Sequence, residues 1–192
     1  MIRKPLCTTL LACCITFAAC SVDEGDDMAY ITAADSCNEV SSGGYIGKWH
    51  FISSDKTITT DKTVKALYYN DNRSELYIES MPLPLLMAAI GHSGSVLAMN
   101  PFTVKSQRIG YSESSFIYRL EAPDYEFSFN EEGKDHQLKV SFQETSEMEL
   151  NSYQHTLSVT LVVKAIYLDG ELAAGEAGYL SITTVPAPAP NL

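Results

Sequence analysis

Short segments in which apolar and polar side chains alternate recur along most of this chain, and turn signals separate them. Two examples run from Tyr45 to Ile52 and from Tyr125 to Phe129. A period of two residues is typical of a β-strand with one buried face, because successive side chains point to opposite sides. Many short strands joined by turns favour an antiparallel sandwich or barrel over a parallel sheet. The expected fold is therefore all-β.

Strands are expected over residues 45–52, 64–68, 76–78, 96–99, 102–105, 116–120, 125–129, 138–142, 157–168 and 179–185. The turn signal Glu131-Glu132-Gly133 joins two of these segments into a predicted hairpin. The proline-rich tail from Pro186 onward cannot donate hydrogen bonds to a sheet, so the fold is expected to end there.

One short helix is expected, from Leu83 to Ile90. Pro84 lies near its start and Gly91 just past its end, which is the usual placement of these two residue types. The segment is apolar on every side, so the rest of the fold must cover it. We interpret it as a lid that closes the core; the alternative is a cap on a barrel mouth that lines a pocket for an apolar ligand.

Two parts of the chain repeat one pattern. Val64 to Tyr68 reads Val-Lys-Ala-Leu-Tyr, and Val163 to Tyr167 reads Val-Lys-Ala-Ile-Tyr. Each copy precedes a turn signal, a second strand and a Pro-x-Pro sequence. The spacing exceeds that of solenoid repeats, which is about 20 to 50 residues. It predicts a duplicated hairpin and a pseudo-symmetric β architecture; the alternative is the shared preference of strands for Val, Ile and Tyr.

The start of the chain carries a targeting signal. Arg3 and Lys4 precede an apolar segment that ends in Phe17-Ala18-Ala19-Cys20, the anatomy of a secretory signal peptide. A cysteine directly after two alanines resembles the signal of bacterial lipoproteins. This resemblance implies cleavage before Cys20 and a membrane anchor of acyl chains, such as palmitate, on that cysteine. An ordinary signal peptide with an unrelated cysteine is the alternative. The expected parts are a signal peptide at 1–19, a lipidated and flexible acidic tether at 20–43, a β domain at 44–186 and a tail at 187–192.

The acidic segment from Ser21 to Asp27 follows directly. It resembles the export signal of surface lipoproteins in the Bacteroidota, which implies an outer-membrane lipoprotein displayed at the cell surface. A solvated spacer is the alternative interpretation, and a position facing the periplasm then stays open.

Charge and cysteine content limit the partners. Loss of Arg3 and Lys4 with the signal takes the formal net charge from −11 to −13. Such an acidic chain is a poor partner for nucleic acid, whose binding relies on Lys and Arg, and for anionic lipid. Cys37 would be the one unlipidated cysteine left, which excludes a disulfide within the chain and leaves pairing between chains open.

No constellation of residues indicates catalysis or a bound cofactor. Gly91-His92-Ser93-Gly94-Ser95 approaches the Gly-x-Ser-x-Gly elbow of hydrolases, but a helix precedes it and a strand follows, the reverse of the elbow's order. A polar turn explains it better. No metal-ligand spacing connects the four histidines His50, His92, His136 and His155. We expect neither an enzyme nor a metal site.

Tyrosines around one turn suggest a binding surface. Tyr68, Tyr69 and Tyr77 flank the turn that contains Asn70 and Asp71. Aromatic rings beside Asp and Asn side chains are typical of carbohydrate-binding surfaces, so these five residues are the candidate ligand contacts. The alternative is structural, since Tyr favours half-buried strands and Asn and Asp favour turns.

The first strand contains Tyr45-x-Gly47-x-Trp49, which is similar to the Gly-x-Trp opening of lipocalin-like barrels. This similarity implies a barrel with a cavity for a small apolar ligand, whereas a Trp49 that fills the core is the alternative. The favoured function is a non-catalytic binding or accessory protein for a glycan. The alternatives are a lipocalin-like carrier and a structural or adhesive surface protein.

Overall fold

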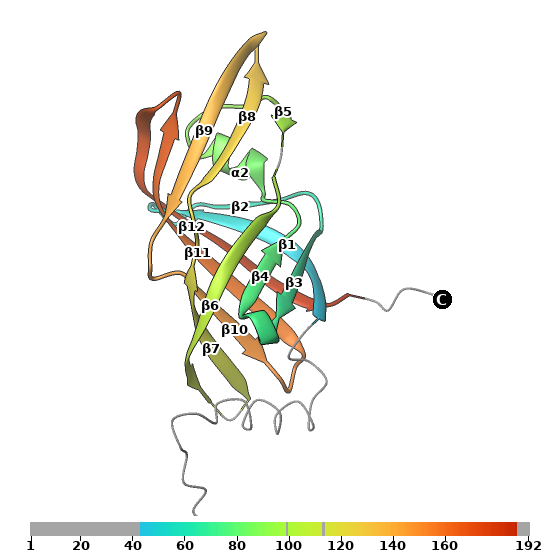
Figure 1. Cartoon of the computed structure of the whole chain (residues 1–192). Coiled ribbons are helices and arrows are strands. Elements are labelled where there is room, and N and C mark those ends of the chain that lie inside the picture. The colour runs from blue at the N-terminus through green and yellow to red at the C-terminus, as the bar shows by residue number, and fades with distance from the viewer. Residues whose placement is uncertain (1–42, 99, 113, 188–192) are drawn as a thin grey trace, which may run out of the picture.

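The computed structural model describes residues 43–98, 100–112 and 114–187. Within these residues, eight antiparallel strands close into a barrel, which confirms an all-β fold and selects the barrel over the sandwich. Around the barrel (Figure 1), the order is β10 (Glu147–Asn151), β7 (Ser115–Glu121), β6 (Phe102–Tyr111), β4 (Glu75–Ile78), β3 (Lys65–Asn70), β1 (Gly43–Ser53), β12 (Glu171–Pro186) and β11 (Thr156–Leu168), which pairs with β10 again.

The same sheet extends beyond one end of the barrel (Figure 1). This extension arises because β11 continues past its barrel partner and pairs with β9 (Lys134–Phe142). Next to β9 lie β8 (Tyr125–Glu131) and then β5 (Ser95–Ala98). We call β11, β9, β8 and β5 the side sheet. A short strand, β2 (Ile58–Thr60), pairs with β1 separately.

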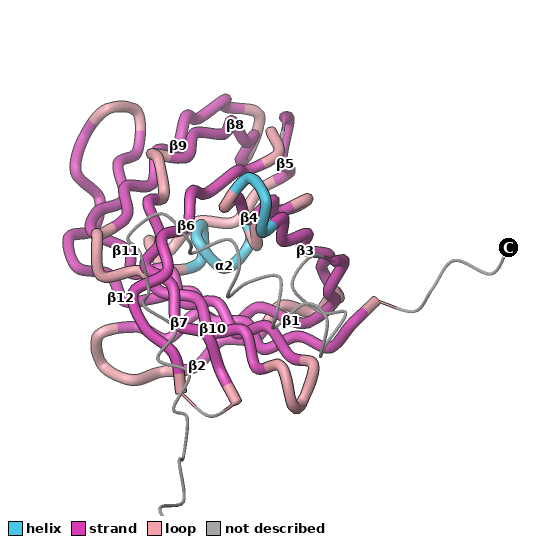
Figure 2. Tube along the Cα trace, turned by 60° about the horizontal axis from the view of Figure 1, so that its bottom comes forward, coloured by secondary structure: helices cyan, strands magenta, loops and turns pink. Residues whose placement is uncertain are grey.

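The expected helix is present as α2 (Leu83–Ala88), between the side sheet and the barrel (Figures 1 and 2). Its Leu83, Leu85, Leu86 and Met87 side chains are buried, whereas Pro84 is exposed. The turn after β3 contains a 3₁₀ helix, η1 (Asp71–Arg73). Neither helix in the described ranges has the length and apolar character needed to span a membrane.

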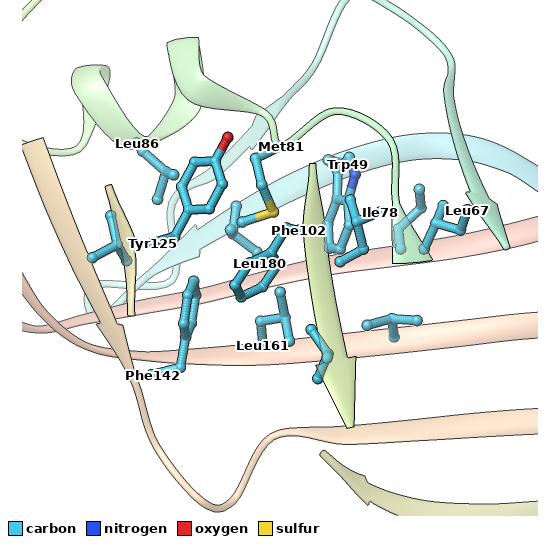
Figure 3. Close-up of a cluster of buried hydrophobic side chains, with 14 of the residues drawn as sticks. Trp49, Leu67, Ile78, Met81, Leu86, Phe102, Tyr125, Phe142, Leu161 and Leu180 are labelled. Carbon is cyan, nitrogen blue, oxygen red and sulfur yellow. The ribbon is translucent and has the colours of Figure 1, made fainter. Parts of the chain in front are cut away.

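Side chains from the barrel strands, the side sheet and α2 form one continuous core (Figure 3). The interior of an eight-stranded barrel is just wide enough to be filled by side chains or to hold one small ligand. Here Trp49, Leu67 and Ile78 are fully buried inside the barrel. Leu86 of α2 is fully buried in the same core and lies beside Tyr125, with Met81 between these two residues and Trp49. The interpretation of the helix as a lid on the core fits this packing.

Ser146 lies where β11 changes partners. Residues 156–160 of β11 pair with β10, and residues 163–168 pair with β9. Between them, the backbone N–H of Val162 donates to Ser146 Oγ at 3.0 Å, and that hydroxyl donates to the carbonyl of Gln143 at 2.9 Å. The hydroxyl of the fully buried Ser146 thus accepts the Val162 N–H at the position where β11 pairs with neither β10 nor β9.

Some elements differ from expectation. The strands β2 and β10 are not expected from the sequence, and β12 begins at Glu171 rather than near Tyr179. Both copies of the repeated pattern form hairpins, but in different registers. Leu67 pairs with Ile78 across a turn that contains η1, whereas the equivalent Ile166 pairs with Ala174 because the second hairpin turns tightly at Asp169 and Gly170.

The predicted signal peptide, Cys20, Cys37 and most of the tether lie outside the described residues. Within the described residues, the strands extend from Gly43 to Pro186.

Candidate functional site

Two tyrosines form an aromatic surface on the outside of the barrel. Tyr68 of β3 lies directly opposite Tyr77 of β4 in the antiparallel register. Their ring centroids are 6.1 Å apart with the planes tilted by 50°, and Tyr68 is 50% exposed. We call this pair the tyrosine platform. It presents two apolar ring faces and two hydroxyl groups.

Strand alternation explains why these rings point outward. Leu67 and Tyr69 are buried inside the barrel, so Tyr68 between them must lie on the outer face. Gly44 of β1 lies opposite Tyr68, and a Cβ atom there would come within 3.0 Å of the Tyr68 ring. The glycine therefore leaves room for the ring to lie against the sheet.

Tyr69 points into the barrel and is only 2% exposed. Its hydroxyl donates to Asp71 Oδ1 at 2.9 Å, and its ring meets that of Tyr118 edge-on at 5.5 Å between centroids. Burial, followed by the proximity of Tyr118, raises the pKa of Tyr69 above the ordinary value for tyrosine. The structure therefore does not bring Tyr69 to the surface with the other candidate residues.

Asn70 and Asp71 shape the turn. Asn70 Oδ1 accepts a hydrogen bond from the backbone N–H of Arg73 at 3.2 Å and caps η1. Asp71 accepts from the Tyr69 hydroxyl. Both side chains therefore stabilise the turn, as expected if Asn and Asp are present for turn geometry. Asn70 is also exposed, on the same face of β3 as Tyr68.

A groove of about 830 Å³ adjoins the tyrosine platform. The two are adjacent, because Thr103 of the groove lies opposite Tyr77 and Glu75 precedes Tyr77 by two positions on the same face. We call it the β6–β7 groove. Its lining mixes polar, charged and apolar residues from several strands and connections: Glu75, Thr103, Lys105, Gln107, Arg119, Leu120, Glu121, Ala122, Pro123, Phe142, Gln143 and Glu144.

Charges alternate in sign across this groove. Lys105 lies opposite Glu75 on one side and opposite Glu121 on the other. Arg119 lies opposite Gln107. Ammonium and guanidinium groups donate hydrogen bonds, and carboxylates accept them, so the groove offers both functions side by side. Such a surface suits a ligand rich in hydroxyl groups.

Sequence reasoning missed the groove residues. Lys105, Gln107, Arg119 and Glu121 occupy ordinary outward positions of alternating strands. The signal that would have found them is the pairing of two segments with complementary charges at alternate positions, and this requires knowledge of the strand register.

Two histidine–carboxylate contacts fasten the side sheet. His92 Nδ1 lies 2.5 Å from Glu131 Oε2, and the backbone N–H of Ser93 donates to Glu131 Oε1 at 2.7 Å. His136 of β9 makes the second contact: its Nδ1 lies 2.8 Å from Oδ2 of Asp169, in the turn between β11 and β12. The hydrolase-like sequence thus forms a turn that docks on the β8–β9 hairpin.

Gly94 allows the turn to pack closely against β8. A Cβ atom at this position would meet the carbonyl oxygen of Asn130 in β8, so only glycine allows so close an approach. In the described ranges, no group of three or more His, Cys, Asp or Glu side chains is arranged to hold a metal ion.

The contact at Glu131 predicts a dependence of stability on pH. The backbone N–H of Ser93 and then the side chain of His92 lower the pKa of Glu131 below its ordinary value. Its carboxylate therefore stabilises the fold above the ordinary carboxyl pKa of about 4.3, and this contribution is lost as the pH falls through the lowered value. Glu131→Gln is expected to reduce the melting temperature at neutral pH, and the difference from the wild type is expected to shrink under acid conditions.

Melting curves of the wild type and Glu131→Gln from neutral pH to about pH 3 measure this effect. Glu132→Gln, at the exposed neighbouring position, is the matched control and should change little. A difference for Glu131→Gln that stays constant over the whole range would contradict the prediction.

A scan against protein-family models, a search of curated proteins and a search of solved structures each find no match to this chain.

Proposed function

We propose that this protein is a lipid-anchored, non-catalytic binding protein of a bacterial outer membrane that binds carbohydrate on the outside of its barrel. The observation that carries the proposal is that the tyrosine platform directly adjoins the β6–β7 groove, since Tyr77 pairs with Thr103. An aromatic surface and a row of hydrogen-bonding side chains then face one ligand.

The chemistry of a sugar matches both parts. A sugar ring has faces of C–H groups, which pack against an aromatic ring, and hydroxyl groups around its edge. The platform offers Tyr68 and Tyr77 to such a face. Lys105 and Arg119 can donate to hydroxyl oxygens, while Glu75 and its neighbours can accept from hydroxyl hydrogens. The mixture of both charge signs favours a neutral sugar over a charged one.

The start of the chain supports the proposed location. The lipoprotein-like Cys20 and the acidic segment from Ser21 to Asp27 are the features expected of a surface lipoprotein. A binding surface on the outside of a tethered barrel is accessible to large polymers, which an enclosed cavity is not.

An interior ligand is less favoured. The core residues of Figure 3 already occupy the barrel and its α2 end, and Trp49 is fully buried among them. A lipocalin-like carrier would have to displace these side chains, which costs the packing energy that they contribute.

Affinity electrophoresis through gels that contain neutral polysaccharides tests the proposal. The mature chain with Cys20→Ser, which takes no lipid, is run through starch, xyloglucan, galactomannan, mannan and mixed-linkage glucan. We expect at least one polysaccharide to retard it. Tyr68→Ala/Tyr77→Ala is expected to weaken that binding about tenfold or more, equivalent to about 1.4 kcal/mol.

Tyr153→Ala is the matched control, because Tyr153 is 84% exposed in the turn between β10 and β11 and belongs to neither the platform nor the groove. Its migration should equal that of the wild type. The proposal is wrong if every gel leaves the wild type unretarded, or if the double variant binds as strongly as the wild type.

A further inference from the structure

A β-bulge turns Tyr167 onto the outer face of the side sheet. Val163 and Ile166 of β11 both lie in the core, a spacing of three that a regular strand does not allow. The register with β9 shifts between Val163 and Ala165, and the next side chains are displaced to the other face. Tyr167 then lies on the outside, opposite Lys139, whereas regular alternation would have buried it.

Polar side chains surround this tyrosine. Tyr167, Lys139 and Glu126 lie in one row across β11, β9 and β8. Lys139 Nζ lies 2.7 Å from Asp124 Oδ2 and 3.9 Å from Glu126 Oε1. Gln137 Nε2 donates to Glu126 at 3.5 Å. An ammonium group, two carboxylates and an amide are thus held together around one aromatic ring.

These residues line a hollow of about 460 Å³, together with Ser141 and Gly170. We call it the Tyr167 hollow. Gly170, in the turn between β11 and β12, has a φ of +87°, and no neighbouring atom lies within 4 Å of the position that a Cβ would take there. The edge of the hollow is therefore open at this glycine. The volume falls within the range of about 300 to 1,000 Å³ that is typical of small-ligand pockets.

The Tyr167 hollow reproduces the chemistry of the tyrosine platform at a separate place. Tyr68 and Tyr167 hold the same position in the repeated Val-Lys-Ala-x-Tyr pattern, and each lies outward beside hydrogen-bonding side chains. The platform lies on β3 and β4 of the barrel, whereas the hollow lies on the side sheet.

We propose that the Tyr167 hollow is a second carbohydrate-binding site, with Tyr167 packing against a sugar ring and Lys139, Asp124 and Glu126 binding its hydroxyl groups. The ligand class rests on the proposed function. Two sites on one molecule bind a polymer more strongly than a short oligosaccharide, because the second contact forms within an already bound complex.

The test compares five proteins in the gel of the polysaccharide that retards the wild type most. They are the wild type, Tyr167→Ala, Lys139→Ala, Tyr68→Ala/Tyr77→Ala and the triple tyrosine variant. The side chain of Lys139 is 41% exposed, so its truncation removes ligand contacts without disturbing the core. We expect Tyr167→Ala and Lys139→Ala each to weaken polysaccharide binding several-fold, and only the triple variant to lose retardation completely.

A second readout separates binding from a structural role. Isothermal titration with a heptasaccharide of the same polymer should give two sites in the wild type and one in Tyr167→Ala, with unchanged melting temperature in Lys139→Ala. If Tyr167→Ala and Lys139→Ala both match the wild type while Tyr68→Ala/Tyr77→Ala abolishes binding, the second site is refuted and the proposed function stands. If no polysaccharide retards the wild type, the proposed function fails, and the second site with it.

Discussion

Gly178→Ala is expected to lower the free energy of unfolding by more than about 3 kcal/mol. Gly178 has a φ of +132°, a conformation that residues with a Cβ atom rarely adopt. A Cβ there would lie 2.1 Å from the carbonyl oxygen of Ile52 and 2.8 Å from the Cα of Ser53. Both neighbours are backbone atoms of β1, so neither can rotate away as a side chain would.

This glycine lies where the barrel and the side sheet meet. Gly178 is the first residue of β12, in chain order, that pairs with β1, and on its other side it pairs with Val163, where β11 begins its bulge. The preceding residues of β12 pair with β11 beside the side sheet, and the strand enters the barrel at this point. A displacement here would disturb the barrel and the Tyr167 hollow together.

Urea denaturation followed by circular dichroism measures the loss of stability. Gly175→Ala in the same strand is the matched control, since no atom lies within 4 Å of the Cβ position at Gly175. We expect the control to differ from the wild type by less than about 1 kcal/mol. Equal effects of the two substitutions would contradict the role of close backbone approach.

Trp49→Ala is expected to cost about 3–5 kcal/mol, the usual range for truncating a large aromatic side chain in a core. Trp49 is fully buried and lies beside Ile78 and Met81 beneath the segment that leads to α2 (Figure 3). Its Nε1 has no hydrogen-bond partner among the described residues. Its contribution therefore comes from packing rather than from a polar contact.

The comparison of Trp49→Ala with Trp49→Phe tests this account. Phenylalanine keeps an aromatic ring in the core and removes a buried donor without a partner, so it should cost clearly less than alanine. Circular dichroism is the suitable signal, because Trp49 is the only tryptophan and both variants lose its fluorescence. Equal losses in the two variants would mean that the indole N–H, and not the ring volume, stabilises the core.

Local patterns in the sequence predict the elements of this fold well. The alternation from Tyr45 to Ile52 and from Tyr125 to Phe129 predicts β1 and β8, and the apolar segment between Pro84 and Gly91 predicts α2. These signals suffice because a strand or a short helix depends on side chains within a few residues of one another. The outward position of Tyr68 follows from the same alternation.

The tertiary structure alone decides how these elements are joined. Closure of the barrel requires β10 to pair with both β7 and β11, and β11 changes partner at the buried Ser146. Lys105 and Glu121 come together only through the register of β6 and β7. The bulge after Val163 reverses the alternation that would have buried Tyr167. Each of these features depends on contacts between distant segments, so the sequence determines the strands and the turns, while the long-range pairing determines the groove, the hollow and the core.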